Sequence, residues 1–140
     1  MKKILLVVLI GSAMTMVPAA FADASLFDRM GGAPIVAQVV NQSLELSMAD
    51  PRTRRSFHKI NLKRLREKLS EQICTLSNGP CRYAGDGMKE VHAGLDITDA
   101  EFNGMVEHLI TALDANGVGL REKNELLKLL APLKRDIVTK

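Results

Sequence analysis

Apolar residues recur every three or four positions in several stretches of this 140-residue chain, and this spacing limits its fold more than any other feature. Such spacing places the apolar side chains on one face of an α-helix. No stretch shows the alternation of apolar and polar residues that is typical of a half-buried strand. The length suits one domain. The sequence therefore predicts a single all-α domain with about four main helices.

These helical stretches have recognisable ends. Ser25 can cap a brief first helix, Asn61 is a suitable cap for a later one, and Thr98 with Glu101 forms a capping box. Pro132 lies inside the last helix and predicts a kink, because proline removes a helix hydrogen bond. The main helices are expected at about residues 33–48, 62–76, 98–115 and 120–138.

Residues 1–22 have the pattern of an export signal. A basic start precedes an apolar core over residues 4–10, and the small-residue pattern Ala20-Phe21-Ala22 predicts cleavage before Asp23. The alternative is a retained membrane anchor, but the apolar run is short for a span. We therefore expect an exported, periplasmic chain whose mature domain is residues 23–140 and which has no membrane contact after cleavage.

The mature chain is close to electrically neutral. Without Lys2 and Lys3, 17 of the 19 Lys and Arg residues remain, against 16 Asp and Glu residues. A dedicated nucleic-acid binder usually carries a strongly basic face, so this balance argues against one. The sequence also shows no phosphate-binding loop or paired carboxylate site that would indicate a kinase or a hydrolase.

Cys74 and Cys81 are the two cysteines of the chain and lie seven positions apart. In an oxidising, exported setting such a pair usually forms a disulfide, here between the end of a helix and the loop that follows it. The alternatives are a redox pair and a metal site, for which His92 is the one histidine within reach in sequence.

The chain has three histidines, and they differ as candidates for chemistry. His108 lies near the apolar face of the 98–115 helix, and His58 lies in a basic loop, so packing and solvation account for them. His92 lies on a short helical turn over residues 88–93, between two apolar helices. Such a histidine can point into the space between the helices, where neutral imidazole is a suitable axial ligand for haem iron.

The segment around His92 resembles a known family. Residues 88–98, Met-Lys-Glu-Val-His-Ala-Gly-Leu-Asp-Ile-Thr, are similar to the proximal-histidine segment of group 1 truncated haemoglobins. The likeness covers about residues 25–138 and continues, in the right order, in the double glycine of Leu26–Gly32, the loop Asn78–Gly85 and the segment Leu130–Leu133. The resemblance implies a truncated globin domain, a two-over-two helical sandwich around haem b (iron protoporphyrin IX).

Carried over residue by residue, the resemblance implies a set of haem contacts. His92 matches the proximal iron ligand, and Phe57 matches a ring stacked against the haem. The other matching positions line the haem or its distal side: Leu44, Leu65, Leu69, Gln72, Met88 and Leu109. Plain helix packing also explains each leucine of this set.

Several distal positions depart from the family pattern. Leu44 and Leu69 stand where many members carry groups that hydrogen-bond dioxygen, so we expect weakly held oxygen and ready autoxidation, with Gln72 as the remaining donor. Lys68 stands where some relatives place a distal iron ligand, and His58 is a second candidate for that position. A solvated lysine, or one paired with a haem propionate, is the simpler interpretation of Lys68.

Three functions are compatible with these residues. The first is reversible binding of a diatomic gas (O₂, NO or CO) at iron ligated by His92, as in oxygen transport. The second is a redox protein, or an enzyme with NO dioxygenase or peroxidase-like activity, with Lys68 on the iron. That function requires an external electron donor, because the chain has no reductase domain. The third is a haem-free helical module that binds a partner, against which His92 and Phe57 argue.

Overall fold

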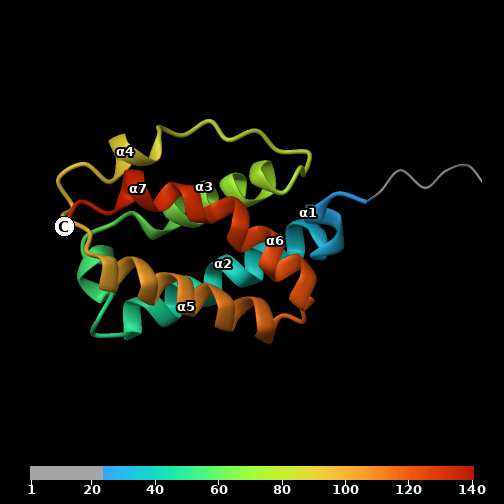
Figure 1. The fold of residues 1–140 in the computed structure, drawn as a ribbon, viewed down its shortest axis with the longest axis horizontal. Coiled ribbons are helices and arrows are strands. Elements are labelled where there is room, and N and C mark those ends of the chain that lie inside the picture. The colour runs from blue at the N-terminus through green and yellow to red at the C-terminus, as the bar shows by residue number, and fades with distance from the viewer. Residues whose placement is uncertain (1–23) are drawn as a thin grey trace, which may run out of the picture.

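A computed structural model describes residues 24–140, which fold into helices and contain no strand over that range. The predicted signal peptide at residues 1–22 lies outside the described residues. The four long helices are α2 (Gly32–Ala49), α3 (Leu62–Leu76), α5 (Asp99–Ala115) and α6 (Leu120–Leu130) (Figure 1). The short ones are α1 (Leu26–Arg29), η1 (Arg54–Phe57), α4 (Met88–Val91), η2 (Ala131–Leu133) and α7 (Lys134–Ile137). The predicted all-α class is confirmed.

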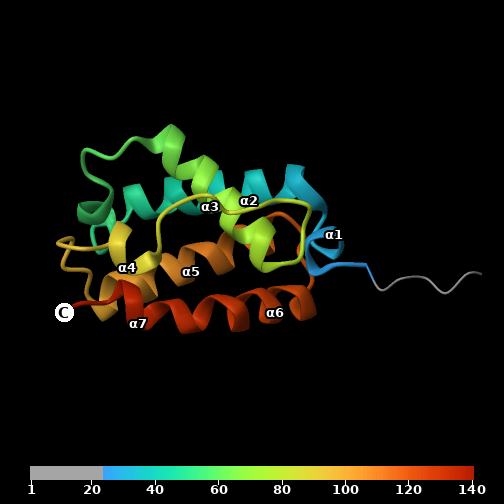
Figure 2. The same cartoon turned by 90° about the horizontal axis from the view of Figure 1, so that it is seen from above.

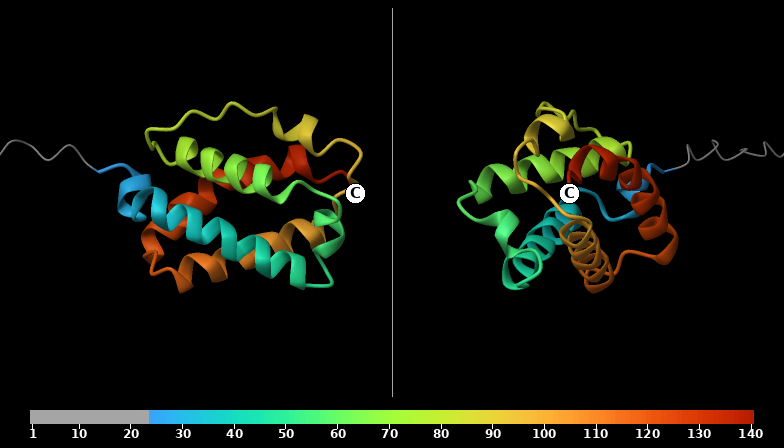
Figure 3. Two further views of the ribbon diagram at one scale, coloured as in Figure 1. Left: turned by 180° about the vertical axis from the view of Figure 1, so that it is seen from behind. Right: turned by 60° about the vertical axis from the view of Figure 1, so that its left-hand side comes forward.

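The long helices form two layers. Seen from above, α2 and α3 lie on one side of the molecule, and α5 and α6 lie on the other (Figure 2). α2 packs against both α3 and α5, and α3 also contacts α6. This is the predicted two-over-two arrangement, and Figure 3 shows it from behind and from one end. None of the helices in residues 24–140 is both long enough and apolar enough to cross a membrane.

The helix ends follow the local chemistry of the sequence. The side-chain oxygens of Ser25 and Asn61 accept hydrogen bonds from backbone N–H groups of the first turns of α1 and α3. Thr98 and Glu101 form the predicted capping box in front of α5. At Pro132 the last predicted helix divides, and α6 passes through η2 into α7. The kink occurs at the proline because its nitrogen has no hydrogen to donate.

The core lies between the two layers and is largely aliphatic. α2 contributes Val40 and Leu44, which are 1% and 0% exposed, and α5 and α6 contribute Leu113 and Leu126, which are 1% and 0% exposed. α3 differs, because among its apolar residues at helical spacing (Leu62, Leu65, Leu69, Ile73 and Leu76) only Ile73 is buried. The leucines of α3 are half-buried, so part of the apolar face of α3 lies outside the core.

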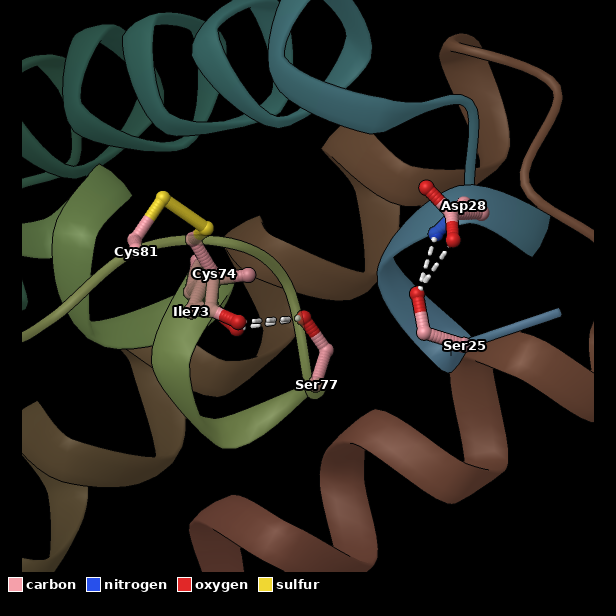
Figure 4. The surroundings of a disulfide bond; sticks show 6 residues. All are labelled: Ser25, Asp28, Ile73, Cys74, Ser77 and Cys81. Carbon is pink, nitrogen blue, oxygen red and sulfur yellow. Dashed lines mark hydrogen bonds between the residues drawn. A yellow bond between two sulfur atoms is a disulfide. The ribbon is translucent and has the colours of Figure 1, made fainter.

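A disulfide fastens the segment that follows α3. This segment, residues 77–87, passes over α3 to reach α4 (Figures 1 and 3), and we call it the arch. Cys74 at the end of α3 is bonded to Cys81 in the arch, with 5.8 Å between their Cα atoms (Figure 4). The predicted disulfide is thus confirmed, and both sulfur atoms are unavailable to a metal. Gly79 is required at this turn, because a Cβ atom there would lie 2.6 Å from the Cys74 sulfur.

The C-terminus fastens the segment between α4 and α5. The backbone N–H of Thr139 donates to the carbonyl oxygen of Ile97 at 3.0 Å. The Lys140 ammonium lies 2.9 Å from the Asp96 carboxylate. α7 also packs against α4. The short helix α4 is therefore held between the disulfide-anchored arch and the C-terminal residues.

Candidate functional site

A cavity of about 280 Å³ lies between α3 and the arch with α4. This volume is close to the lower end of small-molecule sites, ~300 Å³. One wall comes from α3 and carries Arg64, Leu65, Lys68, Leu69 and Gln72. The opposite wall comes from the arch and α4 and carries Tyr83, Asp86, Met88, Val91 and His92. The half-buried apolar face of α3 is thus explained, because it lines this cavity.

His92 is oriented by a hydrogen bond to its own helical turn. Its Nδ1 atom lies 2.8 Å from the backbone carbonyl oxygen of Met88. A carbonyl oxygen can only accept, so in the neutral imidazole Nδ1 carries the proton and Nε2 keeps its lone pair. This is the arrangement that metal-ligating histidines use, because the second hydrogen bond fixes the tautomer and raises the basicity of the ligand nitrogen.

The backbone after His92 is held by an arginine from another element. Gly94 has φ +74°, a left-handed conformation that favours glycine. The guanidinium of Arg55 then donates to the carbonyl oxygens of Leu95 and Asp96 at 3.3 and 3.1 Å. Arg55 lies in η1, two residues before Phe57, so its hydrogen bonds connect η1 to the segment that follows His92.

Arg55 is itself fixed by Glu101. Its Nε and Nη2 atoms donate to the two carboxylate oxygens of Glu101 at 2.9 and 2.7 Å, and Glu101 is 7% exposed. Burial raises the pKa of this carboxyl group, but hydrogen bonds from Arg55, Thr98 and Ser56 outweigh it and lower the pKa to about 2. Glu101 is therefore ionised near neutral pH and holds the arginine in place.

The distal wall, which α3 provides, carries the apolar side chains Leu65 and Leu69 and the polar side chains Arg64, Lys68 and Gln72. Leu65 and Leu69 line the cavity and also pack against the core. The Gln72 amide nitrogen donates to the sulfur of Met88 at 3.2 Å, so α3 and α4 touch at that point. The Lys68 ammonium lies 2.7 Å from the Glu71 carboxylate and is 30% exposed. Lys68 therefore lines the cavity as one partner of an ion pair.

Three predicted haem-lining residues lie in the core rather than on the cavity wall. Leu44 is fully buried and Leu109 is 8% exposed, and Phe57 packs against the same cluster. Leu65 and Leu69 connect this cluster to the cavity because they contact both. The structure thus brings His92, Met88, Lys68, Gln72, Leu65 and Leu69 together around the cavity and places Leu44, Phe57 and Leu109 behind its distal wall.

The other two histidines do not line the cavity. His58 is exposed at the end of η1. His108 is half-buried, with Nδ1 at 2.9 Å from Ser47 Oγ and Nε2 at 3.1 Å from Asp50 Oδ2. This hydrogen-bonded Ser-His-Asp series has the composition of a nucleophile triad, but Ser47 is 0% exposed and no substrate can reach it. It joins α2 to α5, so of the surface or packing roles expected for His108 the structure shows packing.

Sequence reasoning missed several residues of the cavity. Ile60 and Asn61 line it just before and at the cap of α3, and Tyr83, Asp86 and Val91 line it from the arch and α4. The Tyr83 hydroxyl donates to the carbonyl oxygen of Asp86 at 2.9 Å, which shapes the arch beside the cavity. The loop segment Asn78–Gly85, which carried part of the family resemblance, was the signal that could have indicated Tyr83.

An all-helical sandwich in which one histidine faces an apolar cavity has the features of the globin class of haem proteins. The chain belongs to the bacterial-like globin family, whose family model matches residues 25–139. It is 36% identical, over 83% of this chain and 85% of the relative, to the group 1 truncated hemoglobin GlbN of Mycolicibacterium paratuberculosis. It is 27% identical, over 83% of this chain and 98% of the relative, to GlbN of a Nostoc species.

Solved structures show the same fold. The truncated hemoglobin of Tetrahymena pyriformis in its Fe(III) form superposes with a TM-score of 0.79 at 23% identity, over 84% of this chain and 100% of that one. The 2/2 hemoglobin from a Synechococcus species gives 0.77 at 22% identity, with the same coverage. The predicted truncated globin fold is confirmed, and membership of the family implies a haem cofactor.

Proposed function

We propose that this protein binds haem b in the cavity between α3 and α4, with His92 as the iron ligand, and reversibly binds a diatomic gas. The hydrogen bond from His92 Nδ1 to the Met88 carbonyl oxygen carries this proposal, because it leaves Nε2 as a bare donor nitrogen at the cavity wall. When bound, the haem iron would supply the site for O₂, NO or CO.

The chemistry of the cavity fits such a group. His92 is a single protein ligand, and no cluster of three His, Cys, Asp or Glu side chains within residues 24–140 could hold a metal ion by itself. A porphyrin brings its own ring nitrogens, so one imidazole is sufficient. The leucines of α3 and Met88 offer an apolar surface to the porphyrin, and the half-buried state of Leu65 and Leu69 leaves that surface available.

The polar end of the cavity fits the carboxylate side of haem. Arg64 and Lys68 line the cavity from the first half of α3. The N–H groups at the start of a helix add positive potential, and the first turn of α3 contains no acidic residue. We infer that Arg64 pairs with a haem propionate and that Lys68 can exchange Glu71 for the second one.

The two leucines of the distal wall determine how the gas is held. Leu65 and Leu69 cannot donate a hydrogen bond, and the amide of Gln72 is occupied by the Met88 sulfur. Dioxygen held without a donor is weakly stabilised, because hydrogen bonding favours the polar oxygen complex. The relatives named above are hemoglobins. With these residues the present chain would bind O₂ loosely, whereas NO and CO depend less on a hydrogen-bond donor and would be affected less.

The second candidate is a redox protein, or an enzyme that consumes NO or peroxide, with Lys68 as a distal ligand. The observation that favours it is the position of Lys68 on the cavity wall. Its ammonium is paired with Glu71, so ligation would require loss of both that partner and a proton. An external electron donor would be needed for turnover.

We further propose that the chain is exported to the periplasm after cleavage before Asp23. The disulfide supports an oxidising compartment, because such bonds are rare in reducing cytosol. N-terminal sequencing of the protein recovered from the periplasmic fraction tests this directly. A first residue of Asp23 is expected, and a chain found in the cytosolic fraction with residues 1–22 retained would contradict it.

The test of the proposed function is titration of the haem-free protein with haemin, followed by reduction and addition of CO. We expect a Soret band that saturates at one haem per chain and a shift of that band with CO. An absent Soret band would leave the haem-free partner-binding module as the remaining hypothesis. Saturation with haem but no response to CO or NO would indicate an occupied sixth position and favour the redox alternative.

A further inference from the structure

One lip of the cavity carries positive charge that the protein itself does not neutralise. We call Lys59, Lys63 and Arg64 the basic rim; all three are exposed, and none has an ion-pair partner within residues 24–140. Two neighbouring cations are neutralised, since Arg55 is paired with Glu101 and Lys68 with Glu71. Other cations of residues 24–140 also lack an ion-pair partner, among them Arg54, Arg82 and Lys89, but the basic rim brings three such cations together at the start of α3.

This placement opposes the stability of α3. The start of a helix already has a positive potential, and cations in the first turn add to it. Lys63 and Arg64 occupy that turn, which contains no acidic residue. Lys59 adopts φ 61°, a left-handed conformation that glycine or asparagine adopts more readily. A charge cluster that costs the fold stability in two ways indicates a role outside the fold.

Haem would use only part of this charge. Haem b has two propionates, and Arg64 and Lys68 line the cavity where they could meet them. Lys59 and Lys63 do not line the cavity and remain exposed beside it. Two cations would therefore still face solvent at the mouth of the loaded site.

Exposed apolar side chains lie at the same mouth. Ile60 and Val91 line the cavity from its two walls and are 37% and 43% exposed. An apolar centre with charged residues at its edge is the usual anatomy of a protein interface. The opposite lip carries exposed residues of both signs, Arg82, Asp86, Lys89 and Glu90, so the excess positive charge of the mouth lies on the basic rim.

We propose that Lys59 and Lys63 of the basic rim, together with Ile60 and Val91, form the docking surface for an acidic electron-donor protein. This inference rests on the proposed function, because such a partner needs a haem iron to reduce. The partner would give up one electron and so be oxidised. The haem iron would take up that electron and pass from the ferric to the ferrous state. Charge complementarity would bring the donor to the cavity mouth and raise its rate of association.

A nucleic acid fits this surface less well. Binding along a phosphate backbone takes a continuous basic face, because affinity grows with the number of phosphates contacted. Here the basic rim has three cations, and on the facing lip the acids Asp86 and Glu90 alternate with Arg82 and Lys89, so there is no continuous basic face. A compact acidic protein can meet the basic rim with one part of its surface and leave the opposite lip, which carries both signs, free.

The experiment uses a plant-type [2Fe–2S] ferredoxin, a small acidic one-electron donor, with the haem-loaded protein. The variant is Lys59→Glu/Lys63→Glu, which spares the cavity wall. The matched control is Arg121→Glu/Lys128→Glu on α6, which changes the net charge equally. Arg121 lies at the start of α6, near α1 and at the opposite end of the molecule from the start of α3 (Figure 1). Binding is measured by calorimetry with oxidised ferredoxin, and haem reduction by stopped flow with reduced ferredoxin.

We expect the Kd at low ionic strength to rise at least tenfold in the rim variant and less than twofold in the control, with a parallel fall in the reduction rate. Added salt should weaken wild-type binding and remove the difference between the variants. Equal effects in both variants, or no salt dependence, would overturn the proposal. The proposal would also be overturned if ferredoxin did not bind while an oligonucleotide or anionic vesicles bound in a way that depends on Lys59 and Lys63.

Haem content separates this test from that of the proposed function. Both variants should hold one haem per chain and respond to CO as the wild-type protein does. A wild-type chain that takes up no haem would defeat the proposed function itself. Full haem loading with ferredoxin binding that ignores Lys59 and Lys63 would defeat only the docking surface.

Discussion

The Nδ1 atom of His92 lies 2.8 Å from the carbonyl oxygen of Met88, one helical turn earlier. This single contact sets the tautomer of the imidazole and leaves Nε2 as a free donor nitrogen. Met88 also accepts a hydrogen bond from Gln72 of α3 through its sulfur. One residue of α4 thus orients the proposed iron ligand and touches the opposite wall of the cavity.

Lys68 should not ligate the iron at neutral pH, because its ammonium is paired with Glu71. We expect a five-coordinate, high-spin ferrous spectrum that Lys68→Ala leaves unchanged. Visible absorption of the reduced proteins measures this. A low-spin ferrous protein that becomes high-spin in Lys68→Ala would instead support the redox alternative, and Lys63→Ala serves as the matched control on the same helix.

Leu69→Gln should slow the loss of dioxygen. Leu69 lines the cavity and is half-buried, so a glutamine fits there without overpacking the core, whereas Leu44 is fully buried. One new hydrogen bond to a polar ligand is worth about 1.5 kcal/mol, which corresponds to roughly tenfold in the dissociation rate. Stopped-flow measurement of O₂ release tests this, with Leu69→Met as the control that adds no donor. An equal slowing in both variants would show that packing, rather than a hydrogen bond, is responsible.

Opening the disulfide should loosen the arch. Cys81→Ala breaks the bond at its exposed end and leaves the buried Cys74 in place. We expect the free energy of unfolding to fall by about 2–3 kcal/mol in urea titrations of the haem-free protein. Mass analysis of the alkylated wild-type protein should show both cysteines protected until reduction. Two thiols that alkylate freely in the exported protein would contradict the bond.

Glu101 should make the stability of the protein sensitive to acid. Its folded pKa of about 2 lies below the ordinary value of 4.5, so its contribution is complete above about pH 4.5 and is lost as the pH falls toward 2. Glu101→Gln should reduce the free energy of unfolding by roughly 2 kcal/mol at pH 7 and flatten its decline between these pH values. Denaturant titrations at several pH values measure both effects.

The control for Glu101 is Glu45→Gln, which changes an exposed carboxylate on α2. It should alter the free energy of unfolding by less than about 0.5 kcal/mol. The contrary result is that the free energies of unfolding of Glu101→Gln, the control and wild type all fall in parallel between pH 4.5 and 2. That result would show that the Arg55–Glu101 pair is not the source of the acid sensitivity.

The helices were predictable because their signals are local. The caps at Ser25, Asn61 and Thr98 use side chains within three residues of the groups they satisfy, so the sequence contains both partners. The kink at Pro132 has the same local origin. His92 was recognisable as a candidate because it lies on a short turn between apolar helices and in a segment with a strong family resemblance.

The membership of the cavity was not predictable from spacing, because it depends on which helices meet. Leu44 and Leu69 have the same side chain and similar helical settings, yet one is in the core and the other on the cavity wall. The partners of Arg55 and His108 come from other elements, across long sequence separations. Only the folded chain brings these groups together, and no sequence periodicity records their contacts.

The role of His92 is tested most directly by the haem content and ferrous spectrum of His92→Gly, with and without added imidazole. We expect wild type to hold one haem per chain, the variant to lose it or retain it poorly, and imidazole to restore both the haem and a five-coordinate spectrum. The haem-free variant should remain as helical as the wild-type apoprotein by circular dichroism. A variant that keeps stoichiometric haem with an unchanged spectrum, and gains nothing from imidazole, would show that His92 does not ligate the iron.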